Sequence, residues 1–323
     1  MSVESSLRGY EGKSVYLAFS GGSDSSAMAH ALKRVGSIVT CVYVDHGWGE
    51  HGKEWIDVCK RMADRLAFDY IHFSIDSSSV KGEGLEDSSR NGRYGVLASI
   101  LKKDDVMLTA QHMDDQAETF VIQLLRGGGV AGLSCMPLRR ELGCGYLERP
   151  WLSVPKREIM EYINKHDIQY ISDPSNFCED MDRNFVRHRV IPVIASHRWT
   201  NPSAMIARSA DNMQVSMEVE KDWYNMKRDA MLTNGLPDIK RLAAMNNPLI
   251  STFMKYWIAE NGVKTPSKER LAAITDAIVK GAGVTIQWEG GSISTKKGVI
   301  SLEGRTAKSH ALTCENGWDS CLL

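Results

Sequence analysis

The sequence predicts an α/β protein in which a parallel, doubly wound sheet is followed by a mainly helical region and a short C-terminal β hairpin. Two observations carry this prediction. Four short apolar runs alternate with helical stretches over residues 14–110, which is the rhythm of a parallel sheet covered by helices on both faces. From Val154 onward the apolar residues follow a helical period instead. We therefore expect two domains, over residues 1–200 and 201–323.

The predicted strands are SVYLAF, SIVTCVYV, FDYIHFSI and DVMLTA, at residues 14–19, 37–44, 68–75 and 105–110. Three of them are too apolar to alternate strictly, as expected for strands that are buried on both faces. Open parallel sheets bind ligands at the carboxyl ends of their strands. The loops after Phe19, Val44, Ile75 and Ala110 are therefore where we expect the chemistry.

The helical half begins with PKREIMEYINKH, where the proline suits the first turn of a helix. Further helical patterns cover residues 184–195, 203–230, 249–260 and 266–280. After them, VTIQWEGGSISTKKGVISLEG contains short strands joined by glycine-rich turns, which predicts the terminal hairpin.

The composition is that of a soluble globular protein, with 43% hydrophobic and 24% charged residues. No apolar run approaches the length of a membrane span, and the N-terminal segment lacks a signal peptide's apolar core, so we expect a cytoplasmic protein without a membrane partner. The seven cysteines form no C-x-x-C pair, which argues against a disulfide framework and against a zinc or iron–sulfur site. Because the net charge is −1, any binding of nucleic acid must come from a local patch.

A glycine- and serine-rich loop directly follows the first predicted strand and opens a helix. Its glycines let the backbone approach a phosphate, and its hydroxyl and amide groups can donate to an anion. A carboxylate in such a loop makes sense as a ligand of Mg²⁺ that bridges phosphate oxygens, whereas an N-capping turn of small residues is the alternative. The loop comprises Ser20, Gly21, Gly22, Ser23, Asp24 and Ser25.

Two further clusters carry candidate functional side chains. Asp115 and Glu118 are three residues apart, so they share a helix face near the end of the fourth strand. There the two carboxylates could hold Mg²⁺ or accept protons. The alternative is an acidic first turn of a helix that only faces solvent. His112 could contact a phosphate or a base, or be purely structural. Residues 182–208 contain five arginines and a single acid, the footprint of a nucleic-acid surface or of a charged solvated helix. Those arginines are Arg183, Arg187, Arg189, Arg198 and Arg208.

The loop SGGSDS resembles the SGGxDS pyrophosphate loop (PP-loop) of the ATP pyrophosphatases, and the segment AQHMDDQAET at residues 110–119 with LLRGGGVAGLSCMP after it resembles the signature of the tRNA(Ile)-lysidine synthetase family. Further matches follow in the family's order: VDHG at 44–47, EDSSRNGRY at 86–94, RPWL at 149–152, DPSN at 173–176 and RNFVR at 183–187. The resemblance covers roughly residues 14–215 well. The family usually has two adjacent histidines where this chain has Gln111 and His112.

The resemblance implies a fold of the adenine nucleotide alpha hydrolase type and a ligase that uses ATP and Mg²⁺. ATP would adenylate the C2 carbonyl oxygen of the wobble cytidine in a tRNA(Ile) with a CAU anticodon, and L-lysine would then displace AMP. By this resemblance Asp24, Arg90, His112, Asp115 and Glu118 are catalytic candidates, with Asp24 and Asp115 as candidate metal ligands.

The same resemblance makes the helical domain over residues 201–323 a tRNA-binding domain and leaves a homodimer open. The candidate tRNA-binding residues are Arg183, Asn184, Arg187 and Arg189. Alternatives are a tRNA thiolase, an amidating ligase of the same superfamily, and a non-catalytic RNA-binding protein that retains the fold. The missing C-x-x-C weighs against the thiolase.

Overall fold

The computed structural model describes residues 2–45, 52–75, 85–172, 182–296 and 299–304. The chain divides into two compact units, Met1–Gln214 and Val215–Leu323, and the boundary falls within one long helix, α9 (Pro202–Met231). The predicted loops at residues 46–47 and 173–176 lie outside the described residues.

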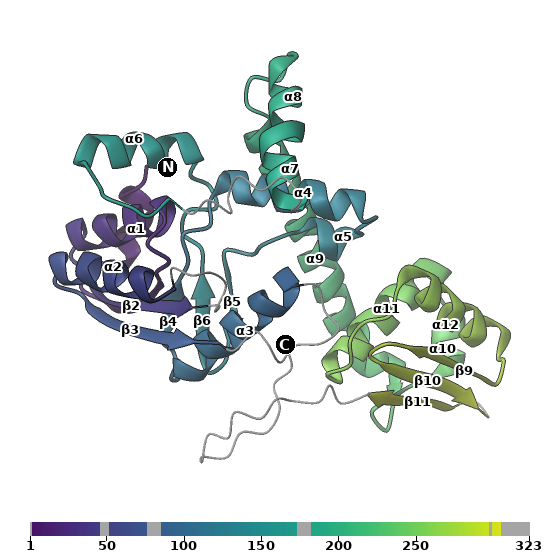
Figure 1. The fold of residues 1–323 in the computed structure, drawn as a ribbon. Helices are drawn as coiled ribbons and strands as arrows, with labels where there is room; N and C mark the ends of the chain where they lie inside the picture. The colour runs from purple at the N-terminus through teal and green to yellow at the C-terminus, as the bar shows by residue number, and fades with distance from the viewer. Residues whose placement is uncertain (1, 46–51, 76–84, 173–181, 297–298, 305–323) are drawn as a thin grey trace. The chain divides into compact units, whose positions relative to one another are not determined.

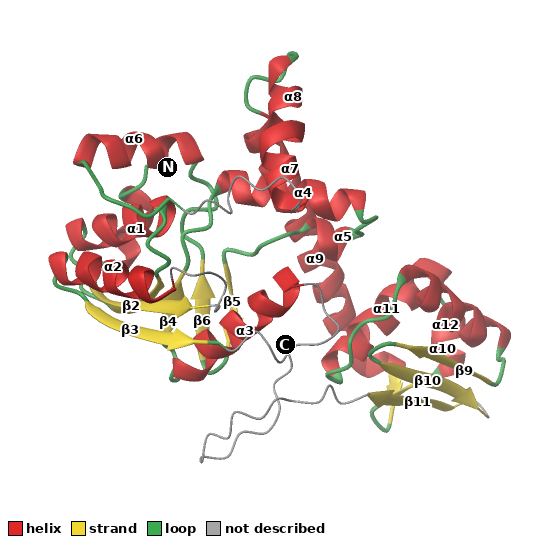
Figure 2. Cartoon of the chain, in the orientation of Figure 1, coloured by secondary structure: helices red, strands yellow, loops and turns green. Residues whose placement is uncertain are grey.

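The first unit is built on a six-stranded sheet in the order β3-β2-β1-β4-β6-β5 (Figure 2). The four predicted strands are confirmed as β1 (Ser14–Ala18), β2 (Ile38–Asp45), β3 (Asp69–Ser74) and β4 (Val106–Leu108), and all of them pair in parallel. Two short strands were not predicted: β6 (Gly145–Glu148) pairs with β4 in parallel, and β5 (Arg139–Leu142) closes the edge antiparallel to β6.

Helices cover both faces of this sheet, which explains why its central strands are continuously apolar (Figure 1). Along β2, Val39, Cys41 and Tyr43 pack into one buried cluster with α1 (Ser23–Arg34) and α6 (Lys156–His166). The alternate residues Val42 and Val44 pack into a second cluster with α3 (Leu85–Ile100). This alternation is the two-residue period of a strand, so the prediction of doubly buried strands is confirmed.

Among the described residues, the remaining helices of this unit are one that precedes β1 and five that follow a strand in the chain. They are η1 (Ser5–Tyr10), α2 (Gly52–Arg65), α4 (Met113–Leu125), α5 (Val130–Leu133), α7 (Asp182–Phe185) and α8 (Ile191–Ser196). A π-helical segment over Val186–Val190 joins α7 to α8, so the helix predicted over residues 184–195 is continuous but changes its winding. π-Helical turns inside helices occur often at functional sites.

The second unit contains helices packed against a small antiparallel sheet. Its helices after α9 are α10 (Ile239–Ala243), α11 (Asn247–Glu260) and α12 (Lys268–Lys280), and its first two strands are the short pair β7 (Leu232–Thr233) and β8 (Leu236–Pro237). The predicted terminal hairpin is a three-stranded sheet of β9 (Val284–Trp288), β10 (Gly291–Lys296) and β11 (Val299–Gly304). Ile293 and Ile300 join Phe253 and Trp257 in its core.

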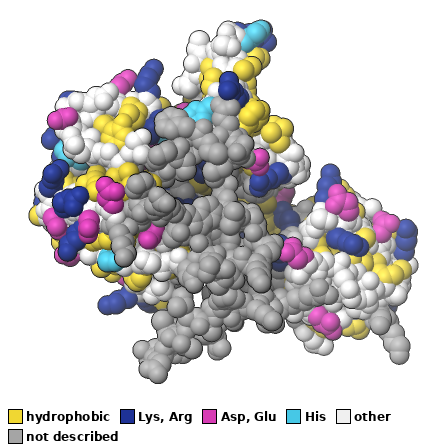
Figure 3. All heavy atoms as spheres, in the orientation of Figure 1, with side chains coloured by type: hydrophobic (Ala, Val, Ile, Leu, Met, Phe, Trp, Pro, Cys, Tyr) yellow, Lys and Arg dark blue, Asp and Glu magenta, His cyan; other side chains and the backbone are white. Residues whose placement is uncertain are grey.

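The surface mixes charges of both signs. On the face drawn in Figure 3, Lys and Arg side chains are interspersed with Asp and Glu side chains, as the net charge of −1 would suggest. Among the described residues, no helix has both the length and the apolar character needed to cross a membrane.

Candidate active site

The glycine-rich loop lies between β1 and α1, and its backbone conformation depends on Gly21. This residue has a φ of +73°, which L side chains rarely adopt, and a Cβ placed on it would lie 2.7 Å from Cys59 Sγ. Its carbonyl oxygen accepts hydrogen bonds from the Ile171 amide at 2.8 Å and from Ser26 Oγ at 3.0 Å. The loop is therefore held by Ile171, in the segment that follows α6, and by Ser26 of α1.

The N-terminus of α1 forms the far end of the same loop. Gly22 is the N-cap residue and makes no side-chain capping hydrogen bond, so the amides of the first turn keep their capacity to donate to a ligand. These amides and the helix dipole favour an anion at this point. Ser20 Oγ lies 3.2 Å from Ser25 Oγ, which places two hydroxyl groups beside the same turn. The arrangement is suited to binding phosphate.

His112 stands between the loop and the first turn of α4, and it is only 3% exposed. Its Nε2 lies 3.7 Å from Asp24 Oδ2 and 3.4 Å from Asp115 Oδ2. Its Nδ1 accepts from the Asp115 amide at 3.4 Å while its own amide donates to Asp115 Oδ2 at 3.0 Å, which forms a capping box. His112 therefore both starts α4 and joins two carboxylates that are far apart in sequence.

The electrostatics of this cluster follow from burial and opposite charge. Burial by itself would lower the pKa of His112, but the carboxylates of Asp115 and Asp24 outweigh it and raise that pKa. Burial acts to raise the pKa of Asp24, yet His112 and Lys156 together lower it to about 2. Asp24 is therefore ionised at neutral pH, as a carboxylate ligand of a metal must be.

Asp24 and Asp115 are the carboxylates that could hold Mg²⁺. Both approach the same imidazole nitrogen, so their oxygens face a common region, and carboxylate oxygen is the donor that Mg²⁺ prefers. Mg²⁺ commonly uses one or two carboxylates and completes its shell with phosphates and water. Within the described part of the chain, no cluster of three or more His, Cys, Asp or Glu residues could bind a metal without such partners. The donor set fits a metal that arrives with a nucleotide.

A second cluster surrounds Glu118, one turn further along α4 and only 1% exposed. Arg187, in the π-helical segment, binds it through two contacts, Nε to Oε1 at 2.6 Å and Nη2 to Oε2 at 2.9 Å. Arg187 Nη2 also reaches Asp115 Oδ1 at 3.2 Å. Burial raises the pKa of Glu118 above its ordinary value, and the contact with Arg187 acts in the opposite direction. Glu118 is thus occupied by an arginine.

The other arginine-segment candidates have different surroundings. Arg183 Nη2 donates to Thr119 Oγ1 at 2.9 Å, and its Nε lies 3.5 Å from Glu118 Oε2. Asn184 is buried, whereas Arg189 is exposed. The structure therefore brings Arg183 and Arg187 to the acidic face of α4, and a role of this segment in tRNA binding stays a prediction.

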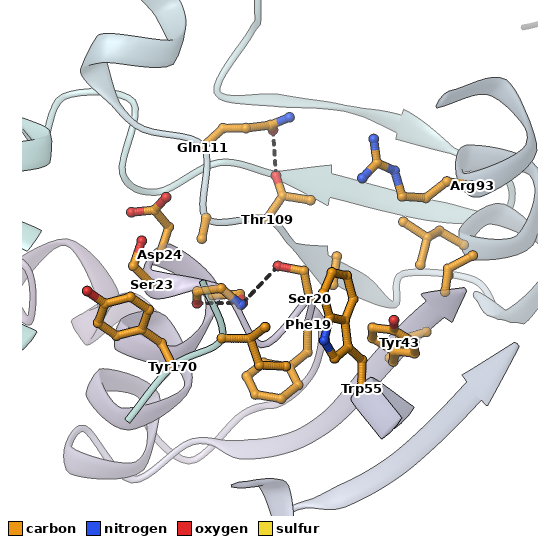
Figure 4. A pocket seen from close by; sticks show the side chains of 18 of the residues that line it. Phe19, Ser20, Ser23, Asp24, Tyr43, Trp55, Arg93, Thr109, Gln111 and Tyr170 are labelled. Carbon is orange, nitrogen blue, oxygen red and sulfur yellow. Dashed lines mark hydrogen bonds between the residues drawn. The ribbon is translucent and has the colours of Figure 1, made fainter. Parts of the chain in front are cut away.

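A cavity of about 620 Å³ opens above the glycine-rich loop. Figure 4 shows side chains from several strand ends around it, with Asp24 and Ser23 on one side and Arg93 on the other. Asp115 contributes to its wall. Further lining residues are Ser20, Tyr43, Trp55, Arg93, Thr109, Gln111 and Tyr170. This is the strand-end position that the sheet topology predicts for a ligand.

Gln111 is held in one orientation by a buried arginine. Its Oε1 accepts hydrogen bonds from Arg149 Nε and from Thr109 Oγ1, each at 2.7 Å, and Arg149 is only 2% exposed. Because an Arg N–H can only donate, the carbonyl oxygen must face Arg149. The amide nitrogen then lies on the side turned toward Arg93 in Figure 4, where it can donate to a ligand.

Two site residues were not among the candidates predicted from the sequence. Lys156, the first residue of α6, places its Nζ 2.5 Å from Asp24 Oδ1 and 2.8 Å from Ser23 Oγ. Asp114, the neighbour of Asp115, accepts from the Lys156 amide at 2.7 Å and from Ser203 Oγ at 2.9 Å, so it ties α4 to α6 and α9. The proline before Lys156 marked the helix start but could not show what the helix contacts.

Arg90, a catalytic candidate, lies in α3, and its side chain is outside the described residues, so its role stays a prediction. Arg93, one turn later on the same helix, lines the cavity.

Comparisons with known proteins agree with this geometry. Residues 2–194 match the family model of the PP-loop domain. A tRNA(Ile)-lysidine synthase from Methylococcus capsulatus is 33% identical over 91% of this chain and 69% of its own length. A tRNA(Ile)-lysidine synthase from Pectobacterium atrosepticum is 32% identical over 82% of this chain and 61% of its own length. This chain thus spans between 61% and 69% of these two relatives.

One solved structure supports the fold alone. The U34-tRNA thiolase NcsA from Methanococcus maripaludis superposes with a TM-score of 0.52 at 15% identity, over 65% of this chain and 77% of that chain.

Proposed function

This chain belongs to the tRNA(Ile)-lysidine synthase family of PP-loop proteins, and from that premise we propose that it ligates L-lysine to C2 of the wobble cytidine of a tRNA(Ile) with a CAU anticodon, using ATP. The observation that carries the proposal is the convergence of the glycine-rich loop and the acidic start of α4 on one cavity of about 620 Å³. Asp24 from the loop and Asp115 from α4 both lie within 4 Å of His112 Nε2, at 3.7 and 3.4 Å.

In the first step the loop binds the triphosphate. The α1 N-terminus and the hydroxyls of Ser20 and Ser25 donate to phosphate oxygens, and the cytidine C2 carbonyl oxygen attacks the α-phosphorus. The bond from that phosphorus to the β-phosphate bridging oxygen breaks, and pyrophosphate leaves. Gln111 offers its amide N–H groups to an oxygen in the cavity, since Arg149 and Thr109 occupy its carbonyl oxygen.

Mg²⁺ is part of the proposal. Asp24 and Asp115 would hold it, and when bound it would offset the charge of the phosphate oxygens.

In the second step the lysine ε-amine attacks C2, the bond between C2 and the adenylate oxygen breaks, and AMP leaves. A carboxylate must orient the amine and accept its proton. Asp115 lines the cavity, whereas Glu118 is 1% exposed and held by Arg187. We therefore assign the contact with lysine to Asp115 and a positioning role to Glu118, which fixes Arg187 beside Asp115 at 3.2 Å.

Recognition of tRNA would use the exposed part of the arginine segment together with the second unit. Arg189 is exposed, so we assign it a phosphate contact, and we assign none to Arg187, whose guanidinium is bound by Glu118. A homodimer is one expected assembly state of the protein.

The direct test incubates the protein with ATP, radiolabelled lysine and unmodified tRNA(Ile) carrying a CAU anticodon, followed by nuclease digestion. The expected result is a labelled nucleoside whose formation requires ATP and releases AMP and pyrophosphate. A matched tRNA with a CAU-to-GAU change removes the target cytidine and should give none. Pyrophosphate release without lysine transfer would favour a different PP-loop reaction, and no release at all would favour a non-catalytic RNA-binding protein.

A further inference from the structure

The ammonium group of Lys156 lies directly on the glycine-rich loop. Its Nζ contacts Asp24 Oδ1 at 2.5 Å and Ser23 Oγ at 2.8 Å, and these two residues form the first turn of α1. The lysine is 132 positions from Asp24 in the sequence. A cation is thus delivered to the phosphate-binding end of α1 by another helix.

The base of this side chain is fixed, whereas its tip has room to move. The Lys156 amide donates to Asp114 Oδ2 at 2.7 Å, and α6 is anchored below by the buried Ile159 and Ile163. The side chain itself is 33% exposed. Four methylene groups let an ammonium group shift by several ångströms while the backbone stays in place.

The charge of the glycine-rich loop indicates a role for the ammonium group of Lys156. The segment SGGSDS contains an acid and no base, so a triphosphate that binds at α1 meets Asp24 as a like charge. Helix dipole and hydroxyl groups are partial charges only. Lys156 supplies the opposite charge to Asp24 at hydrogen-bonding distance.

We propose that Lys156 is a phosphate-binding residue of the ATP site, which pairs with Asp24 in the nucleotide-free protein and donates to a β- or γ-phosphate oxygen when ATP binds. The inference rests on the proposed ATP site. It assigns to α6 the positive charge that the glycine-rich loop itself lacks, and it leaves the Asp24 carboxylate available to a cation that accompanies the nucleotide.

The test compares Lys156→Gln with Lys165→Gln, which removes the same charge from an exposed position in the last turn of the same helix. Calorimetry measures binding of α,β-methylene-ATP with Mg²⁺, which the enzyme cannot cleave, and binding of AMP, which lacks the β- and γ-phosphates. We expect Lys156→Gln to weaken binding of the ATP analogue about tenfold, equivalent to about 1.4 kcal/mol, and to change AMP binding less than about twofold. Lys165→Gln should change neither affinity.

Four outcomes overturn the inference. If Lys156→Gln binds the ATP analogue with unchanged affinity, the contact between Lys156 and Asp24 is a surface ion pair without a role in nucleotide binding. If Lys156→Gln weakens the binding of AMP and of the ATP analogue equally, the residue has a structural role. The same conclusion follows if Lys156→Gln lowers the melting temperature and Lys156→Arg does not restore it. If the unaltered protein binds neither nucleotide, the proposed function fails first and this inference fails with it.

Discussion

Replacing Gln111 by His restores the residue that the family usually carries, and the structure predicts a small effect. The Gln111 carbonyl oxygen accepts from Arg149 Nε and Thr109 Oγ1, each at 2.7 Å. A neutral imidazole can accept from one of these donors and still donate its N–H into the cavity. We expect the imidazole to keep the charged donor Arg149, so the bond that is lost is the neutral one from Thr109, which contributes about 0.5–1.5 kcal/mol. We therefore expect the adenylation rate to change by less than about tenfold, or about 1.4 kcal/mol of barrier.

The pH dependence distinguishes the two roles that this position could have. A protonated histidine would lose its acceptor and place a second cation beside the buried guanidinium of Arg149, so the imidazole should stay neutral. Pyrophosphate release measured between pH 5.5 and 8.5 should show no new inflection near the ordinary histidine pKa of about 6.5. Gln111→Glu is the control, since a carboxylate accepts from both donors but offers the ligand no N–H, and it should be slow. A gain of more than tenfold in Gln111→His together with a new inflection would refute the reasoning.

The remaining predictions concern the loop, the acidic face of α4 and the arginine segment. Asp24→Ala should abolish ATP-dependent pyrophosphate release at a nearly unchanged melting temperature, and release at the normal rate would contradict a role at the phosphates. Gly21→Ala should lower the free energy of unfolding by more than about 1 kcal/mol, because φ is +73° and the new Cβ meets a neighbouring thiol; denaturant titration measures this. Glu118→Gln should cost about 1.5–3 kcal/mol in the same assay by weakening a charged hydrogen-bonded pair. Arg189→Ala should reduce the slope of the logarithm of tRNA affinity against the logarithm of salt concentration by about one, whereas Arg187→Ala should leave this slope unchanged. Filter-binding titrations measure the slopes, and equal slopes in the two variants would contradict the different roles of the two arginines.

The central part of the fold was predictable because its signals are local. Strands β1 and β2 are apolar on both faces and are followed by loops of small or polar residues, so each can be recognised from a single stretch of sequence. Strand β5 is only four residues long, and of Arg139–Leu142 only Leu142 is buried. Its pairing depends on the position of β6 rather than on its own pattern, which is why it was missed. The segment predicted as the terminal hairpin forms three strands, because β10 pairs with β9 on one side and with β11 on the other.

The site was predictable to the extent that it is contiguous in sequence. The glycine-rich loop and the start of α4 can each be recognised from the spacing of residues in one short segment of the sequence. The structure brings both segments to one cavity. Lys156 gave no such signal, because its partner Asp24 is 132 positions away. Arg149 belongs to the segment RPWL that resembles the family pattern, but its contact with Gln111, 38 positions away, could not be read from the sequence.

The two carboxylates of α4 show how packing assigns different tasks to residues that the sequence treats alike. Asp115 and Glu118 share a helix face, and either could have been the group that meets the lysine substrate. The longer side chain of Glu118 points to where the π-helical segment packs, and there Arg187 binds both of its oxygens. A carboxylate so occupied cannot leave its partner without exposing a buried charge, which makes it a poor proton acceptor for an incoming amine. Asp115 also has a partner at each oxygen, but its side chain is 13% exposed and it lines the cavity, so we assign the reactive position to this residue.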